Sequence, residues 1–232
     1  MKKFLILGIL LSQFVSIKAQ DSFDIGAFVG GAFYLGDINK TNFFYNTTPA
    51  IGGVLRLNLA NRYAVRANIT KLQLKGSDLD FDNMYQNARM HSFSTSVVDF
   101  NTQFEFYFLD YSPYDDGYNF TPYISAGVGG GFLATDNNLS TYFLNVPFSM
   151  GFRVRVSKNI SAGAQWEFKK TFTDLIDGLD QNTYPEGALF GGKQKTYFSD
   201  KDWYSYAGIF VTITLYKPTG TCSAYGKSYK YR

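Results

Sequence analysis

The sequence contains few residues that could perform catalysis. Its single histidine, His91, lies beside Arg89 and Ser92, so a triad of serine, histidine and aspartate could be built only there. A histidine on a surface loop is the simpler interpretation of this position. The sequence shows no cluster of histidine and cysteine for a transition metal, and no glycine-rich turn that opens a helix to bind phosphate. We therefore expect no enzymatic activity, no metal and no cofactor.

A second set of residues is charged, and its members recur in several segments of the chain. Within each segment these residues lie on the polar side of an alternating pattern, and they form what we call the lumen charge cluster: Arg56, Arg66, Asp99, Glu105, Arg153, Arg155 and Glu167. If the segments close into one sheet, the arginines and carboxylates meet inside it and can form ion pairs. A catalytic cluster or an ion path would use the same residues. A charge-paired plug that fills the interior is the favoured interpretation.

Residues 98–109 show how such a segment is built. Their sequence is VDFNTQFEFYFL, in which apolar and polar residues alternate. Successive side chains of a strand point to opposite faces, so one face holds Val98 and four phenylalanines while the other holds Asp99 and Glu105. Lipid on one side and a polar interior on the other would produce this pattern. The segment is therefore predicted to be a membrane-spanning strand.

Seven further segments alternate in the same way, and together the eight cover residues 22–34, 49–59, 63–70, 94–109, 123–133, 146–156, 160–168 and 203–215. Long connections are expected at residues 36–48, 75–92, 134–142 and 169–201, with shorter ones between them. An even strand count and such an alternation are typical of bacterial outer-membrane barrels. The predicted fold is all-β, an eight-stranded antiparallel transmembrane β-barrel over residues 20–216. A soluble, exported β-sandwich is the alternative.

The N-terminus has the pattern of a signal peptide over residues 1–19, with a basic start, an apolar run and a cleavage site after Ala19. An uncleaved membrane helix would need about 20 apolar residues. Cleavage removes Lys2, Lys3 and Lys18, which leaves 22 − 3 = 19 basic residues against 19 acidic ones. Without a basic excess, a nucleic-acid partner is not expected. We expect an exported chain in the outer membrane, with both ends of the mature protein in the periplasm because the strand count is even.

Residues 217–232 follow the last predicted strand and are not needed to close the barrel. They form a predicted periplasmic C-terminal tail, whose candidate partner-binding residues are Lys217, Cys222, Lys227, Tyr229, Lys230 and Arg232. A solvated, disordered end and a segment that orders on a partner are both open. The single cysteine would lie in an oxidising compartment, where an unmatched thiol suggests an intermolecular disulfide or a free reactive group.

Short motifs along the chain carry a resemblance to a known family. They are the segment 34–39 (YLGDIN), the segment 49–52 (PAIG), the hairpin with Arg56, Arg62 and Arg66, and the strand with Glu105 and Phe106. With these motifs the sequence resembles the PorG-like family, small outer-membrane β-barrels of the type IX secretion and gliding machinery of Bacteroidetes. The resemblance implies a non-enzymatic component that associates with a periplasmic ring of a lipoprotein and its partner subunit. It also suggests the ring lipoprotein as the disulfide partner of Cys222.

Two functions remain open at this point. The first is a structural anchor of a protein secretion machine, which is fixed in outer-membrane lipid and holds a periplasmic ring assembly through its turns and tail. The second is a small outer-membrane channel or ligand-binding barrel, which would need an interior that charged side chains do not fill. A membrane-embedded hydrolase is disfavoured because the chain has a single histidine.

Overall fold

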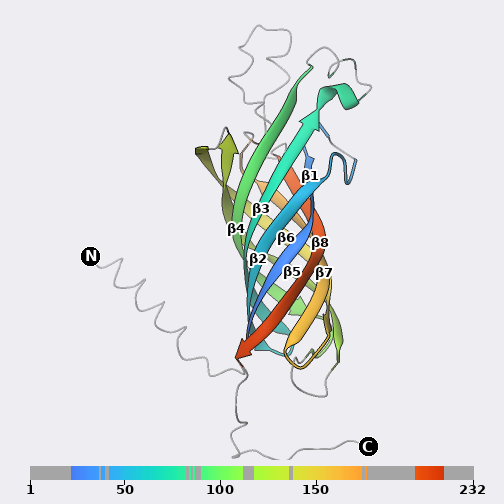
Figure 1. Ribbon diagram of the computed structural model, residues 1–232, viewed down its shortest axis with the longest axis vertical. Helices are drawn as coiled ribbons and strands as arrows, with labels where there is room; N and C mark the ends of the chain where they lie inside the picture. Colours follow the sequence, from blue (N-terminus) through green and yellow to red (C-terminus); the bar gives the residue numbers. More distant parts are fainter. Residues whose placement is uncertain are drawn as a thin grey trace, which may run out of the picture.

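The computed structural model describes residues 22–36, 38–39, 42–81, 84, 86, 90–111, 118–135, 138–173, 176 and 202–216, and these form a closed antiparallel barrel (Figure 1). Its strands are β1 (Ser22–Leu35), β2 (Thr48–Ala60), β3 (Tyr63–Ser77), β4 (Ser92–Tyr107), β5 (Phe120–Thr135), β6 (Asn138–Arg155), β7 (Ile160–Thr171) and β8 (Trp203–Tyr216). Each strand pairs with the next along the chain, and β8 pairs with β1. The predicted eight-stranded antiparallel barrel is confirmed.

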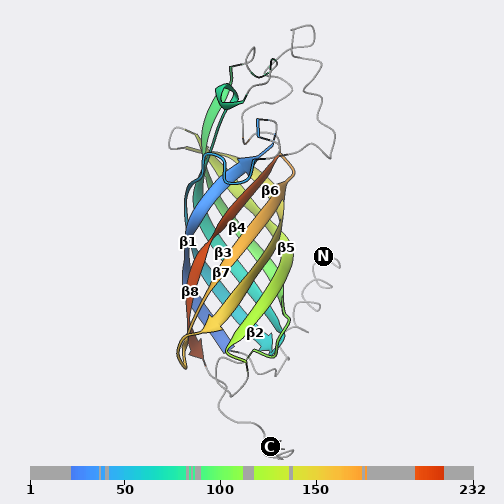
Figure 2. The ribbon, with the colours of Figure 1, turned by 90° about the vertical axis from the view of Figure 1, so that its right-hand side faces the viewer.

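The two ends of the barrel differ. β1 begins beside the end of β8, where Phe23 pairs with Tyr216, and we call this the proximal end. The opposite, distal end carries the connection between β3 and β4, which rises above the other strands in two views (Figures 1 and 2). A short 3-10 helix, Asp78–Asp80, follows β3 at that tip.

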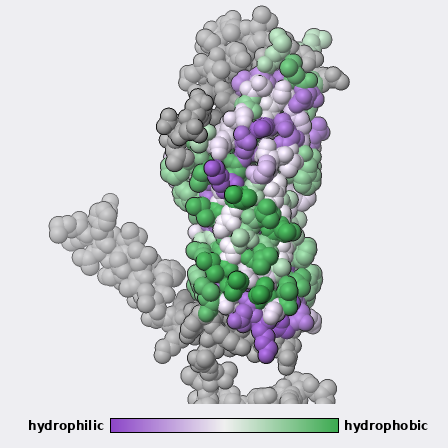
Figure 3. Space-filling view, viewed as in Figure 1, coloured by the Kyte–Doolittle hydropathy of each residue, from purple (hydrophilic) through white to green (hydrophobic). Residues whose placement is uncertain are grey.

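The exterior of the barrel is a continuous apolar belt. Large outward side chains are widely exposed, among them Ile69 (58%), Val128 (70%) and Ile209 (60%). Figure 3 shows this belt as a green band with polar patches above it and below it. Exposed apolar surface of this extent is not left to water in a soluble protein, and we infer that lipid covers it. No helix among the described residues is long and apolar enough to cross a membrane.

Beyond the belt, at the distal end of β3 and β4, the alternation is inverted. Outward positions are now polar, with Lys71 and Lys75 on β3 and Ser94 on β4. The inward side chains of Leu72 and Val97 are fully buried. Water outside and an apolar interior are the pattern of a soluble β-protein. The third strand was predicted to end at residue 70. This was wrong, because β3 continues in the inverted pattern to Ser77.

The hairpin of β5 and β6 is also longer than predicted. A long connection was expected at residues 134–142 and a strand start at residue 146, but β5 runs to Thr135 and β6 begins at Asn138. Pro147 lies within β6, although proline cannot donate a hydrogen bond to the sheet. The barrel accepts it within β6, where it pairs with Lys169 on β7 while the register with β5 skips this position.

The connection between β1 and β2 is bound to the β3 tip through Tyr45. Its hydroxyl donates to Asp80 Oδ2 (2.5 Å) and accepts from the Ser77 amide (3.2 Å). Burial, together with the neighbouring Asp80 carboxylate, raises the pKa of Tyr45 to about 12. The contact therefore stabilises the fold fully below the ordinary tyrosine pKa, and this contribution is lost as pH rises towards the folded-state pKa.

Candidate functional site

The centre of the barrel is built around Glu105, an inward residue of β4. Arg56 binds it with two contacts, Nε to Oε2 (2.7 Å) and Nη2 to Oε1 (3.1 Å). Arg66 Nη1 lies 3.1 Å from Oε1, and the Tyr107 hydroxyl donates to Oε2 (2.9 Å). All four side chains are buried, so one carboxylate is held by two arginines in an interior without access to bulk water.

Toward the distal end the next layer joins β4 to β7 across the interior. Lys169 contacts Asp99 Oδ1 and lies 3.2 Å from Glu167 Oε1. Arg66 Nη2 reaches Glu167 Oε2 at 3.2 Å, which links this layer to the central one. The Tyr204 hydroxyl donates to Asp99 Oδ2 at 2.7 Å. The two carboxylates are therefore bridged by one lysine.

A third layer lies at the proximal end, where β6 meets β1 across the interior. Arg153 Nη2 lies 2.5 Å from Asp24 Oδ2. The same carboxylate accepts hydrogen bonds from Asn58 Nδ2 (2.9 Å) and Thr214 Oγ1 (2.8 Å). The guanidinium of Arg153 stacks over the ring of Tyr111, 4.7 Å from its centroid. Asp24 is thus a fully paired carboxylate.

Charge on the inward faces of the described strands is balanced. The fully buried charged residues of the described strands are four cations and four carboxylates: Arg56, Arg66, Arg153 and Lys169, and Asp24, Asp99, Glu105 and Glu167. Every one of them takes part in an ion pair of 3.2 Å or less. Breaking a buried pair by removing one partner leaves an uncompensated charge, which is strongly unfavourable. The pairs therefore hold one another in place.

The structure brings together six of the seven residues of the lumen charge cluster and leaves Arg155 apart. Arg155 lies partly exposed at the proximal rim and binds the side chain of Asn119. It shares the inward parity of Arg153, but β6 ends at this residue, so the interior no longer surrounds it. Asp99 was expected within reach of an arginine, and its cation is Lys169 instead.

Two members of the interior network, Asp24 and Lys169, were missed in the lumen charge cluster. Asp24 has inward parity in the first predicted strand, and this signal was sufficient to include it. Lys169 follows the predicted end of the seventh strand at residue 168, but β7 continues to Thr171. Extending the alternation by one inward position would have found it.

Aromatic rings fill much of the interior beside the charged layers, and inward glycines make room for them. A Cβ at Gly163 would lie 2.5 Å from the ring of Phe210, and one at Gly131 would lie 2.7 Å from the ring of Phe143. A side chain at either position would displace the ring. Gly131 on β5 and Gly163 on β7 thus relieve crowding in a narrow barrel.

Both ends of the interior are closed by side chains. At the distal end a buried apolar layer lies above the charges, formed by Tyr34, Ile38, Leu72, Leu74, Val97, Leu133, Phe143 and Ile176. Phe93 packs edge-on against Tyr34 (5.0 Å between centroids) and joins β4 to β1. At the proximal end Tyr111 folds into the barrel, and its hydroxyl lies 2.6 Å from Ser161 Oγ. Within the described residues, the arrangement holds charge in fixed pairs between two ends that buried side chains occupy.

The candidate catalytic position does not lie near this network. His91 precedes β4 at the distal tip, where its amide donates to Asp78 Oδ2 (3.0 Å) and its carbonyl accepts from the Asp78 amide (2.8 Å). These contacts close the base of the connection between β3 and β4. Within the described residues, no group of three or more histidines, cysteines or acids could hold a metal ion.

The predicted partner-binding residues lie outside the part of the chain that the structure describes. These are Lys217, Cys222, Lys227, Tyr229, Lys230 and Arg232. The expected signal peptide, residues 1–19, also lies outside it. The last described strand, β8, ends at the proximal end of the barrel, so the tail starts there.

Comparisons with known proteins show which solved structures have a similar fold. Neisserial surface protein A is similar with a TM-score of 0.51 at 8% identity, over 83% of this chain and 97% of that one. The outer membrane protein OprG from Pseudomonas aeruginosa has a TM-score of 0.48 at 11% identity, over 85% and 98%. At such identities the similarity shows the fold alone, that of small outer-membrane barrels. A comparison with curated proteins finds no match. At the level of sequence, residues 2–224 match one family, and the chain belongs to it: the domain of unknown function DUF6089.

Proposed function

We propose that this protein is a non-conducting, non-enzymatic barrel of the outer membrane that anchors a protein assembly on its proximal side. The observation that carries the proposal is the described interior, which holds paired charges and has buried side chains at both ends. A barrel without a path through it acts through its surfaces. The proximal end is then the periplasmic end, since bacterial barrels of even strand number start and finish there.

The proximal rim offers a polar surface for such an assembly. Arg62, in the turn between β2 and β3, pairs with Asp110 at 2.5 Å, and both side chains are about half exposed (48% and 56%). The Asp110 carboxylate raises the pKa of Arg62 above its usual range, so the guanidinium stays charged. The tail begins at the same end, after Tyr216. Turns and tail can therefore meet one partner.

The finer proposal is that the assembly belongs to a type IX secretion-like and gliding machine. Its support is the resemblance of the motifs around Tyr34, Pro49 and Glu105 to the PorG-like family. The partner would be a periplasmic ring that includes an outer-membrane lipoprotein. Isolation of the detergent-solubilised full-length protein, followed by identification of the co-purifying proteins, tests this. Recovery of the barrel without a periplasmic protein would contradict it.

The alternative, a small channel or ligand-binding barrel, gives a different result in a planar lipid bilayer. We expect the purified barrel to show no stable single-channel steps, because ion movement would require separating buried pairs such as Arg56–Glu105. Tyr111→Ala, which removes the proximal closure, is expected to remain silent since the charged layers persist. Well-resolved steps from the unaltered protein would favour the channel and overturn the anchor proposal.

The tail supplies a second expected result. We expect Cys222 to form a disulfide with a partner cysteine, because the chain holds a single cysteine and would be exported. Non-reducing electrophoresis of native membranes should then show a heavier band that disappears on reduction and in Cys222→Ser. Migration of the unaltered protein only as a monomer would refute the disulfide. If deletion of residues 217–232 still leaves the partner bound, the docking site is the proximal connection between β4 and β5.

A further inference from the structure

The connection between β1 and β2 folds back onto the outside of the barrel through residues 42–47, which we call the flap. Phe43 and Phe44 of the flap pack against Phe33 on β1, with ring centroids 6.3 and 4.9 Å away. Both rings also pack against Trp166 on β7, with centroids 5.8 and 5.5 Å away. Since β8 lies between β7 and β1 in the sheet, the two rings span the place where the first and last strands close the barrel.

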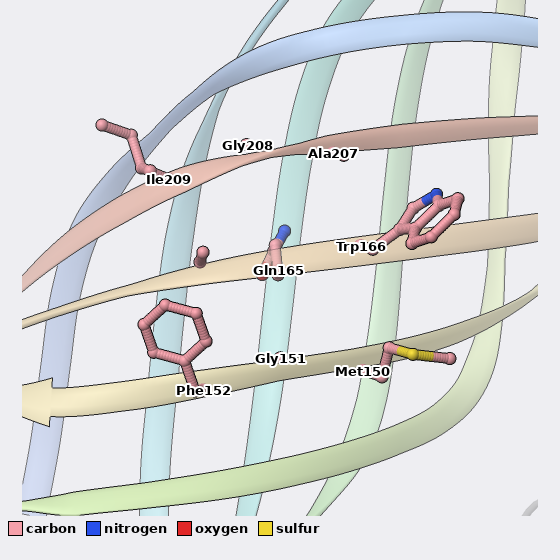
Figure 4. A pocket seen from close by; sticks show the side chains of 9 residues that line it. Met150, Gly151, Phe152, Gln165, Trp166, Ala207, Gly208 and Ile209 are labelled. Atoms are coloured by element: carbon pink, nitrogen blue, oxygen red, sulfur yellow. The ribbon is translucent and has the colours of Figure 1, made fainter. Parts of the chain in front are cut away.

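Small outward residues make room for the flap. Trp166 pairs with Ala207 on β8, beside which it lies in Figure 4, and Ala207 pairs with Gly31 on β1. A Cβ at Gly31 would lie 2.4 Å from Thr47 Cγ2, so the flap rests directly on this glycine. Phe33 has the same outward parity as Gly31, yet it is only 1% exposed because the rings of the flap cover it. The flap is therefore seated on the outer wall.

The two rings of the flap also face the surroundings of the barrel. Phe43 is 55% exposed and Phe44 is 54% exposed. The next outward residue of β7 on the distal side of Trp166 is Phe168, whose ring centroid lies 4.9 Å from that of Trp166. The flap thus meets the wall at a level where the outward residues of β7 are still apolar. Its rings continue the apolar belt.

Several polar groups of the flap have partners within the protein. Thr47 Oγ1 donates to the carbonyl of Phe44 (2.7 Å). The amide of Asn42 donates to Asn39 Oδ1 (2.9 Å), and Asn39 Nδ2 donates to the carbonyl of Asn42 (2.8 Å). The hydroxyl of Tyr45 is bound to the tip of β3. Such internal partners are what backbone and side-chain polar groups need beside lipid, where water is scarce.

The backbone of the flap is strained at the residue that carries its second ring. Phe44 has a φ of 61°, in the left-handed region that a bulky side chain rarely adopts. A conformation of this kind persists only where the surrounding contacts hold it. The contacts of the Phe44 ring with Phe33 and Trp166 do so. The ring is therefore held in one position on the wall.

We propose that the flap inserts Phe43 and Phe44 into the distal leaflet of the membrane, so that lipid is the partner of this surface. Continuity with the apolar belt carries the proposal, because the rings lie against Trp166 and are more than half exposed beside side chains that lipid covers. Irregular backbone is not found in the hydrocarbon core, so the backbone of the flap stays at the headgroup boundary while its rings reach inward. The inference rests on the membrane location proposed above and is independent of the anchor role.

NMR of the unaltered full-length protein in lipid nanodiscs tests the proposal with two paramagnetic probes. One is a lipid that carries a nitroxide on its acyl chain, and the other is a gadolinium chelate dissolved in water. We expect the amide signals of Phe43 and Phe44 to broaden more with the nitroxide lipid than with the chelate. Leu79 is the control, since it is also apolar and widely exposed (66%) but lies in the 3-10 helix at the distal tip. Its amide should respond in the opposite way, and the same response at the flap would overturn the proposal.

Two variants test whether the rings themselves hold the flap in lipid. Phe43→Ser combined with Phe44→Ser should abolish the broadening of the flap by the nitroxide lipid, whereas Leu79→Ser should leave it unchanged. The amide of Ile209, in the apolar belt, should stay broadened in both variants, which shows that the barrel is folded and inserted. Persistent broadening of the flap in the double variant would refute insertion by the rings.

A second copy of the chain is the other possible occupant of this surface. In that case neither probe would broaden the flap of the unaltered protein, and isotope-filtered spectra would show contacts between two copies. This result would also overturn the lipid proposal. Single-channel steps in a planar bilayer would refute the proposed function but would not affect the response of the flap to the two probes.

Discussion

Replacement of Glu105 by glutamine is expected to lower the free energy of unfolding by about 3 to 5 kcal/mol, the usual cost of breaking a buried ion pair by removing one partner. Two buried guanidinium groups, those of Arg56 and Arg66, share this carboxylate. Without it both charges stay in an interior that water does not reach. Urea unfolding of the barrel in detergent micelles, followed by tryptophan fluorescence, measures the loss.

Asp110→Asn is the matched control for this experiment. It also removes one carboxylate from an arginine, but the Arg62–Asp110 pair is about half exposed (48% and 56%). An exposed pair contributes little to stability, because water and salt screen it. Similar losses for Glu105→Gln and Asp110→Asn would show that the interior is hydrated and that the charge-paired plug does not exist.

Replacement of Phe104 by arginine is expected to destabilise the membrane-inserted barrel by about 2 to 4 kcal/mol, the cost of a cation on the lipid face near the midplane. Phe104 points outward from β4, is 50% exposed and belongs to the apolar belt. A guanidinium at this position would have to remain in lipid or deform the membrane around it. The yield of folded barrel in lipid vesicles, measured by heat-modifiable migration, reports the effect.

Ser94→Arg provides the control on the same strand and the same face. Ser94 lies on the distal part of β4, where outward side chains are polar and those inside are apolar. Water is expected at that position, so the arginine should leave the folded yield unchanged. If Ser94→Arg lowered the yield as much as Phe104→Arg, the membrane would extend further along β4 than the belt indicates.

The period-2 alternation determined much of this protein at the level of sequence. Because neighbouring side chains of a strand point to opposite faces, the pattern around Phe104 and Glu105 separates an apolar face from a polar face without any tertiary contact. Repeated eight times, it predicted the strand count and the antiparallel barrel that the structure shows. It also placed Arg56, Arg66 and Arg153 correctly on the inward face.

The tertiary structure alone decided which charges meet. Asp99 and Lys169 lie on β4 and β7, and Arg153 and Asp24 lie on β6 and β1, so both pairs cross the interior between strands that are not neighbours in the sheet. Parity gives the face of a residue, but its depth depends on the register of every strand around the barrel. Arg155 shows the difference, because its parity is inward while its depth places it at the rim.

The tertiary structure also decided where the membrane ends. At the distal end of β3 the alternation continues, but the outward side chains become polar and the inward ones apolar. The outward Ile69 is followed by the outward Lys71, with Leu72 inside. A local pattern cannot tell lipid from water, because either solvent can lie outside or inside a pleated strand. Only the folded barrel shows what each face of a strand contacts. At the distal end the inward side chains form an apolar layer, and deeper in the interior eight buried charges neutralise one another.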